Sequence, residues 1–142
     1  MSTESLPSST QVWVVQRHVT GEVILSDSQD GTFALKREPI PKSIPEDSLL
    51  VRTLYLGNDP AQRLWLQAAN EEAMKYRPEM RATPIGSPMQ AYAAICRVVA
   101  VGDGQSKGTD ADFRVGDLVS TRVDWAEYAV VKKSGATKFE CV

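Results

Sequence analysis

The stretch that decides the fold is Ser48–Arg63 (SLLVRTLYLGNDPAQR). Its first part, Ser48–Leu56, is rich in apolar, β-branched and aromatic side chains, a composition that predicts a strand. Asp59 then precedes Pro60, which is typical of a helix start. The carboxylate can cap free N–H groups, and proline has no N–H that would be left unpaired. We therefore expect a strand followed directly by a short helix, Pro60–Gln67.

Extended segments lie on both sides of this stretch. They are separated by turn residues or by prolines that exclude a helix, and the predicted strands are Val12–Val19, Glu22–Leu25, Thr32–Glu38, Met89–Val101, Asp117–Val123 and Trp125–Val131. One more helical turn is expected at Glu71–Tyr76, and a long loop at Arg77–Pro88. Six or more short strands with one or two short helices predict a mainly β protein built as a partly open β-barrel.

The composition is that of an ordinary soluble globular domain. The chain has 142 residues with a net charge of −2, which does not favour the phosphate neutralisation on which nucleic-acid binding rests. No apolar run reaches the ~20 residues that span a bilayer. Met1–Thr10 lacks the basic start and apolar centre of a signal peptide, and we expect it to be a disordered tail. Residues 11–142 should form one cytoplasmic domain without nucleic-acid or membrane partners.

Thiol and metal chemistry have few candidate residues. The chain contains two cysteines, Cys96 and Cys141, and one histidine, His18, whereas a structural zinc site takes about four such ligands. Cys96 lies in an apolar run and is expected to be a buried, inert thiol. His18 is expected at the polar end of a strand rather than in a catalytic triad. We predict no metal site.

A glycine-rich stretch, Gly102–Gly108, follows a predicted strand and invites comparison with nucleotide-binding loops. The dinucleotide fingerprint requires a glycine where Lys107 stands, and no apolar helix follows. The chain also has no GxxxxGK[ST] phosphate loop. We therefore expect an exposed connection between strands, and no cofactor bound by this chain alone.

Several short motifs together point to one family. Asn58–Arg63 (NDPAQR) resembles the Asp-Pro-Tyr-Met-Arg signature of zinc-independent medium-chain reductases, which include NADPH-dependent alkenal double-bond reductases and prostaglandin/leukotriene reductases. Further segments follow in that family's order: Tyr76–Pro78 (YRP), Ile85–Pro88 (IGSP), Cys96–Val99 (CRVV), Gly116–Val119 (GDLV) and Trp125–Tyr128 (WAEY). The resemblance covers Val12 to Phe139 and implies a GroES-like substrate-side domain. Zinc-dependent relatives carry Cys-His-x-Asp where this chain has Leu56–Asp59 (LGND).

The resemblance also implies a reaction and a cleft. In such reductases hydride from NADPH reaches the β-carbon of an enone or enal, and the carbonyl oxygen needs stabilisation as charge builds on it. The residues implied to line the substrate cleft are Tyr55, Asn58, Ala61, Arg63 and Tyr76. Ala61 stands where relatives have a tyrosine, which implies a roomier cleft. Arg63 has an alternative role as an ion-pair partner of Asp59, four positions earlier, and Tyr76 as a ring that packs over the loop.

Family members continue into a Rossmann domain that binds NADPH and supplies a catalytic tyrosine, whereas this chain stops near Phe139. It therefore resembles the substrate-side domain of an NADPH-dependent enone or alkenal reductase, which alone would not transfer hydride. Two alternatives remain open. One is a stand-alone, cofactor-free small-molecule binder, isomerase or cyclase, and the other is a pseudo-reductase that acts as a protein-interaction module. We expect a small apolar or enone-like ligand, and self-association or a protein partner at the face that a Rossmann domain would cover.

Overall fold

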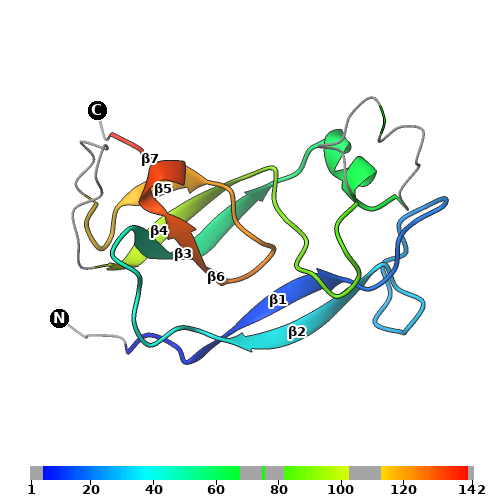
Figure 1. The fold of residues 1–142 in the computed structure, drawn as a ribbon, viewed down its shortest axis with the longest axis horizontal. Coiled ribbons are helices and arrows are strands. Elements are labelled where there is room, and N and C mark those ends of the chain that lie inside the picture. Colours follow the sequence, from blue (N-terminus) through cyan, green and yellow to red (C-terminus); the bar gives the residue numbers. More distant parts are fainter. Residues whose placement is uncertain (1–4, 68–74, 76–81, 103–112, 141–142) are drawn as a thin grey trace.

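The computed structural model describes residues 5–67, 75, 82–102 and 113–140. The elements in chain order are β1 (Ser9–Val15), β2 (Phe33–Pro39), β3 (Ser48–Gly57), the 3-10 helix η1 (Pro60–Trp65), β4 (Ala93–Val101), β5 (Leu118–Thr121), β6 (Tyr128–Lys132), the 3-10 helix η2 (Lys133–Gly135) and β7 (Thr137–Lys138). They form a two-stranded sheet, β1-β2, and a five-stranded sheet, β6-β3-β4-β5-β7, with antiparallel neighbours throughout (Figure 1). Within the described residues the strands do not close into a barrel. The predicted mainly β, partly open GroES-like fold is confirmed.

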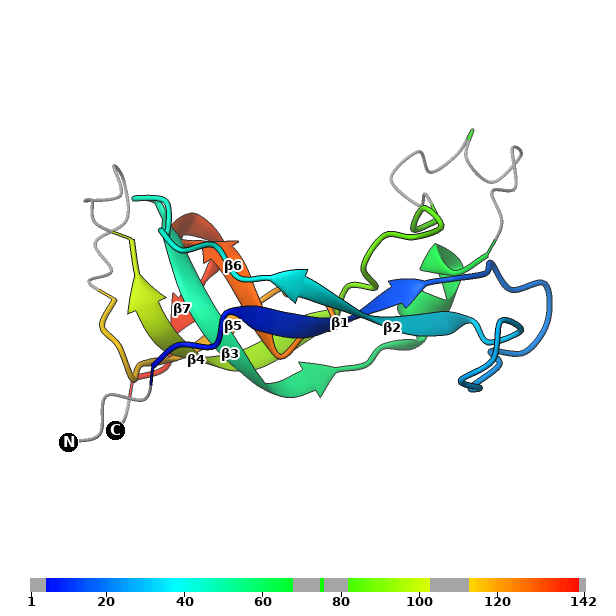
Figure 2. The same ribbon diagram turned by 90° about the horizontal axis from the view of Figure 1, so that it is seen from below.

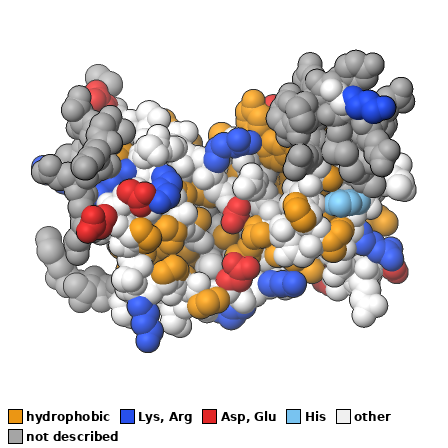
Figure 3. All heavy atoms as spheres, viewed as in Figure 1, with side chains coloured by type: hydrophobic (Ala, Val, Ile, Leu, Met, Phe, Trp, Pro, Cys, Tyr) orange, Lys and Arg blue, Asp and Glu red, His pale blue; other side chains and the backbone are white. Residues whose placement is uncertain are grey.

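Short main-chain contacts join the small sheet to the large one. Val12 forms an isolated bridge with Ala126, and the Trp13 N–H donates to the Trp125 carbonyl at 2.8 Å. Seen from below, the β1–β2 ribbon runs lengthwise across the larger sheet (Figure 2). Hydrophobic, acidic and basic side chains are mixed in the middle of the face that Figure 3 shows.

β3, the strand with the strongest sequence signal, lies between β4 and β6. Residues 49–51 are at most 1% exposed, and the side chains become more exposed toward the end of the strand. The register with β4 shifts between Thr53 and Tyr55, which leaves Leu54 as an extra residue. Such bulges bend a strand and change the direction of nearby side chains, often beside functional sites.

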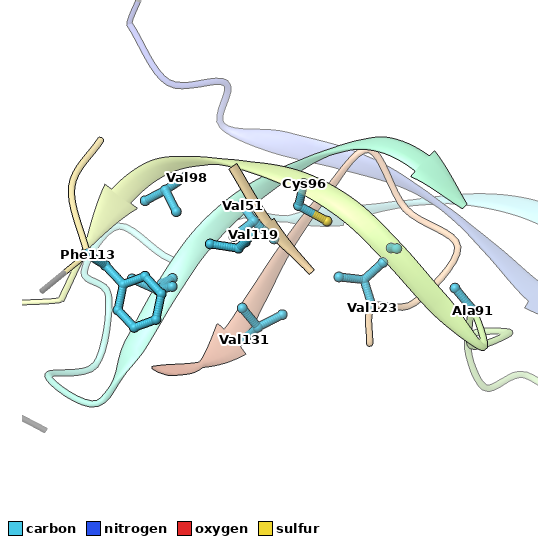
Figure 4. Packing of buried hydrophobic residues seen from close by; sticks show 10 residues of the cluster. Val51, Ala91, Cys96, Val98, Phe113, Val119, Val123 and Val131 are labelled. Atoms are coloured by element: carbon cyan, nitrogen blue, oxygen red, sulfur yellow. The ribbon is translucent and has the colours of Figure 1, made fainter. Parts of the chain in front are cut away.

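The main core consists largely of small β-branched side chains from the larger sheet. Val51, Val98, Val119 and Val131 pack with Phe113 in one buried cluster (Figure 4). Each such side chain contributes about 1.5–3 kcal/mol when fully buried. The cluster packs side chains of β3, β4, β5 and β6 against one another.

The core also contains Cys96, which is fully buried. Burial raises the pKa of the Cys96 thiol to about 11. Because the thiolate is the reactive form, Cys96 is inert at neutral pH. The prediction of a buried thiol is confirmed.

Several predicted boundaries are wrong at the N-terminal side. Ser9 and Thr10, expected in a disordered tail, begin β1 and pair with β2. Glu22–Leu25 does not form a strand, because Ile24 exchanges its hydrogen bonds with Thr32 rather than with a neighbouring strand. His18 lies beyond the end of β1, with its Nε2 2.7 Å from the carbonyl oxygen of Thr83.

Other boundaries moved by a few residues. The helix predicted at Pro60–Gln67 is the 3-10 helix η1. The strand predicted from Trp125 begins at Tyr128, because Asp124 and Ala126 make only isolated bridges. Residues 115 and 116 form a turn shortly before β5, and Gly116 has a φ of 97°. The helical turn expected at Glu71–Tyr76 lies outside the described residues, apart from residue 75, and so does the first part of the expected loop.

Candidate functional site

Helix η1 begins at the cap that the sequence predicted. The Asp59 carboxylate accepts a hydrogen bond from the Ala61 N–H at 2.8 Å, and the Gln62 side chain accepts one from the Asp59 N–H at 2.7 Å. This reciprocal pair is a capping box. Gln62 also donates to the carbonyl of Gln90 at 3.0 Å and is 6% exposed. Sequence reasoning missed Gln62, although an acidic cap followed three residues later by glutamine was available as a signal.

The sequence-predicted site residues follow one another from β3 into η1. Tyr55 is 70% exposed on β3, Asn58 is exposed between the two elements, and Ala61 is half-buried in η1. Among the described site residues, Tyr55 lines the hollow described below, whereas Asn58, Ala61 and Arg63 are not part of its lining. Tyr76 lies outside the described residues, and its role stays a prediction.

Arg63 has a contact that neither sequence interpretation anticipated. Its guanidinium donates to the carbonyl of Gly21, in the turn that follows β1. It forms no ion pair with Asp59, although both residues are described, because the guanidinium is directed to Gly21 instead. The predicted Arg63–Asp59 pair is therefore wrong, and Arg63 ties η1 to the N-terminal part of the chain.

Tyr55 belongs to an apolar hollow of about 490 Å³. The residues that line this Tyr55 hollow come from β1, β2, β3 and the segment before β6: Gln11, Trp13, Leu35, Thr53, Leu54, Tyr55, Leu56, Trp125, Ala126 and Glu127. The indole N–H of Trp125 is buried and has no hydrogen-bond partner among the described residues. Buried donors without a partner are uncommon, and this one lacks an acceptor.

A second hollow of about 510 Å³ lies between the two sheets, and we call it the inter-sheet groove. Asp124 lines it, and burial raises the pKa of this carboxyl, with a further contribution from the negative charge of Glu38. A hydrogen bond from the Gln90 side chain acts in the opposite direction. Sequence reasoning did not select Asp124. The sequence did offer a signal for this residue, because Asp124 is an acidic residue placed directly between the apolar Val123 and Trp125.

Aromatic residues lie beside the groove. The guanidinium carbon of Arg122 is 5.5 Å from the centre of the Trp65 ring, a cation–π distance. The Trp65 ring in turn stacks on Tyr92, with 6.5 Å between the ring centres and 18° between the planes. These contacts connect η1 with the residue that follows β5 and with the segment before β4.

Gly102, the first residue of the glycine-rich stretch, does not fit a phosphate-binding role. A Cβ on Gly102 would lie 1.8 Å from the carbonyl oxygen of Pro45, and the Gly102 carbonyl accepts from Lys133 Nζ at 3.1 Å. Gly102 is thus required by packing against the chain and is not open to a phosphate. Gly104 and Gly108 lie outside the described residues.

Two further features are absent from the described part of the chain. It contains no cluster of three or more His, Cys, Asp or Glu side chains placed to hold a metal ion. None of the helices described is long and apolar enough to cross a membrane.

Comparison with known proteins identifies the family. Residues 11–139 match the family described as the N-terminal domain of oxidoreductase. The chain belongs to this family. The resemblance to the N-terminal domains of medium-chain reductases is thereby confirmed. Among curated proteins no sequence matches this oxidoreductase N-terminal domain.

Solved structures agree on the fold. CurA from Vibrio vulnificus is 22% identical with a TM-score of 0.67, and the match covers 91% of this chain and 32% of CurA. CurA in complex with NADPH gives 22% identity, a TM-score of 0.63, and coverage of 90% and 32%. A putative NADPH:quinone reductase from Mesorhizobium loti is 14% identical with a TM-score of 0.62, and the match covers 96% and 38%. The oxidoreductase N-terminal domain thus spans about a third of these relatives.

Proposed function

We propose that this oxidoreductase N-terminal domain is the substrate-side domain of an NADPH-dependent, zinc-independent reductase that acts on the conjugated double bond of an enone or alkenal. The observation that carries the proposal is the family match over residues 11–139. The likeness to CurA, which has been solved with NADPH, supports it. Because Gly102 packs against Pro45 and is not open to a phosphate, the proposal assigns NADPH to a second domain.

The chemistry of the Tyr55 hollow supports this substrate class. A conjugated ketone or aldehyde has an apolar body and one oxygen that accepts hydrogen bonds. The hollow offers apolar walls, and it includes Trp125, whose N–H lacks an acceptor. The phenol of Tyr55 is a further donor in the hollow, of the kind that stabilises charge on a carbonyl oxygen. Asn58, three residues further along the chain, does not line the hollow, and we propose its amide as a second donor to the same ligand.

The proposal is tested by NMR titration of the chain with 4-phenylbut-3-en-2-one. Shifts should centre on residues 53–58. Asn58→Leu should weaken binding by about 0.5–1.5 kcal/mol, the net value of one hydrogen bond. Ala61→Tyr should also weaken binding, because the larger ring reduces the room for a bulky ligand. Gln29→Leu, a matched amide removal in an exposed turn, should have no effect.

Unchanged binding in both Asn58→Leu and Ala61→Tyr would place the ligand elsewhere and contradict the assignment of the cleft.

Titration of the chain with NADPH, followed by nicotinamide fluorescence, should show no measurable binding. A micromolar dissociation constant would overturn the assignment of the cofactor to a second domain. Zinc should not change the melting temperature.

Two further expectations accompany the proposal. The protein is expected in the reducing cytoplasm, where a thiol such as Cys96 stays free. The exposed apolar side chains around the Tyr55 hollow, with Trp13 40% and Leu35 46% exposed, are expected to contact the cofactor domain or a second copy of the chain. Light scattering tests self-association, and a constant monomer mass at high concentration would contradict it.

A further inference from the structure

The inter-sheet groove runs along the outer edge of β6. This strand pairs with β3 on one side and has no strand on the other, and every residue from Tyr128 to Lys132 lines the groove. Successive side chains of a strand point to opposite faces of its sheet. Because Val130 and Val131 both line the groove, it touches both faces of β6 and lies at the edge of the strand.

Alternate residues of β6 direct their main-chain groups toward β3, as in any antiparallel ladder. Glu127, just before the strand, accepts a hydrogen bond from the Thr53 N–H at 2.8 Å. Lys133, just after the strand, donates its N–H to the Asp47 carbonyl at 2.8 Å. The odd-numbered positions of this segment therefore bond to β3 or to the residue before it, and the even-numbered positions face outward.

The outward groups of β6 are open at the centre of the strand. The Tyr128 N–H donates to the hydroxyl of Thr10 in β1 at 3.0 Å, which agrees with the outward direction of the even positions. The N–H and C=O of Val130 have no hydrogen-bond partner among the described residues, and Val130 is 38% exposed. An open strand edge of this kind is a template for pairing with another chain.

Buried apolar side chains form the floor beside this edge. Val12, Leu50 and Val123 line the groove and are 2%, 1% and 4% exposed. The volume of about 510 Å³ lies within the range of about 300–1,000 Å³ that is usual for ligand sites. The groove shares only Ala126 with the lining of the Tyr55 hollow, so the two are separate sites.

The charged side chains that line the groove include both signs. Glu38 and Asp124 are acidic, and Arg122 and Lys132 are basic. A ligand with a single sign of charge would therefore meet like charges as well as opposite ones. The open main-chain edge, and not the net charge, is the feature of the groove that selects a ligand.

We propose that the inter-sheet groove binds an extended polypeptide segment of a partner protein, which adds as a strand to the outer edge of β6. The main chain of the segment pairs with the N–H and C=O of Val130, and alternate side chains lie on the floor formed by Val12, Leu50 and Val123. In such strand addition, main-chain hydrogen bonds supply the affinity and side-chain contacts supply the preference for sequence. This site is independent of the proposed reductase function.

A single extended chain fits the groove better than the other occupants. A small apolar molecule would cover the floor, but it offers no row of alternating donors and acceptors to β6. A second copy of this chain would present its own β6 edge, which lies in the same recess. Residues 38–41 and 121–124 form the other walls of this recess, so two recessed edges would bring these walls together before the strands could pair.

The experiment is an NMR titration of the full chain with the uncharged peptide acetyl-Thr-Val-Thr-Val-Thr-Val-amide. Signals of residues 128–132 should shift, and the Val130 N–H should become protected from exchange with deuterated solvent. Two comparison peptides are N-methylated, one at every threonine and the other at every valine. Only one alternate set of N–H groups in an added strand faces β6, so one methylated peptide should bind about tenfold more weakly than the other.

A substitution at the edge tests the same contact from the protein side. Val130→Pro removes the outward N–H but no hydrogen bond to β3, and proline is tolerated at edge positions of this kind. It should weaken peptide binding about tenfold. Val130→Ala keeps the N–H and is the matched control, with a much smaller expected effect. The methylated peptides are tested on the unchanged chain, so the test remains valid if Val130→Pro fails to fold.

Three results would overturn the proposal. The first is the absence of shifts at residues 128–132 with millimolar peptide. The second is equal binding of the two methylated peptides, which would mean that pairing with the main chain plays no part. The third is self-association of the chain that Val130→Pro abolishes, which would make a second copy the occupant of the groove.

Discussion

Strand β5 has an aspartate near each end, and the two have opposite surroundings. Asp117, directly before the strand, accepts a hydrogen bond from the Arg114 N–H at 2.8 Å and lies 3.1 Å from Lys138 Nζ. These contacts hold the pKa of its carboxyl below the usual value, the backbone hydrogen bond having the largest effect. Asp124, three residues after the strand, is partly buried near Glu38, and its pKa is raised.

The difference separates a structural charge from one that the fold does not satisfy. Asp117 closes a turn and stabilises the protein by being ionised. Folding raises the pKa of Asp124, so the fold disfavours its ionised form, and such local conflicts are concentrated at functional sites.

The largest expected effect is at the turn end. Phe113 is 5% exposed and packs in the main core, so Phe113→Ala should destabilise the protein by about 3–5 kcal/mol. Urea denaturation followed by circular dichroism measures this. A loss below about 1 kcal/mol would mean that the turn end is not anchored by the core, and the structural role of this end would then be in doubt.

A smaller effect is expected for Asp117→Asn. This variant should lose about 1–2 kcal/mol at pH 7, because a hydrogen bond to a charged group and an ion pair are both weakened. The pKa of Asp117 is lowered by folding, so its contribution is complete above the ordinary carboxyl pKa of 3.8 and is lost as pH falls through the folded-state value. Wild type and variant should therefore converge in acid. A constant difference at all pH values would contradict this electrostatic explanation.

The smallest effect, of opposite sign, is expected for Asp124→Asn. Folding raises the pKa of Asp124, so any stabilisation from this group exists below pH 3.8 and is lost as pH rises through the folded-state value. At pH 7 the variant should be more stable than wild type by up to about 1 kcal/mol, the usual scale of partly solvated charge interactions. A lower melting temperature at pH 7 would mean that Asp124 is structural, and the contrast with Asp117 would disappear.

The sequence predicted those strands and turns that are determined by interactions between residues close together in the chain. β2 and β3 were predicted almost to the residue, since their apolar patterns and flanking turn residues agree. The Glu22–Leu25 prediction was wrong because the pattern cannot show that Ile24 bonds to Thr32 within its own loop. β-propensity describes a suitable surface, but a strand also needs a neighbour with free hydrogen-bonding groups.

The candidate sites were predicted less completely than the strands. The family motif located Tyr55, Asn58 and Ala61 on one continuous stretch. The inter-sheet groove is lined by residues of β2, of β6 and of the segment after β5, which are far apart in the sequence and come together only after two sheets have packed. No spacing rule connects such residues, and this is why sequence reasoning did not find the groove.

The joining of the two sheets also determines when the protein can fold during synthesis. The hydroxyl of Thr10, near the start of β1, accepts a hydrogen bond from the Tyr128 N–H, 118 positions later. Ribosomes add about 5–20 residues per second, so β1 waits for many seconds before its last partner emerges from the exit tunnel. Through that interval β1 can pair with β2 and with residues 86–89, but not yet with residues 125–128. We therefore expect nascent chains stalled before residue 126 to bind a chaperone that recognises exposed apolar strands, and chains released at full length to lose it.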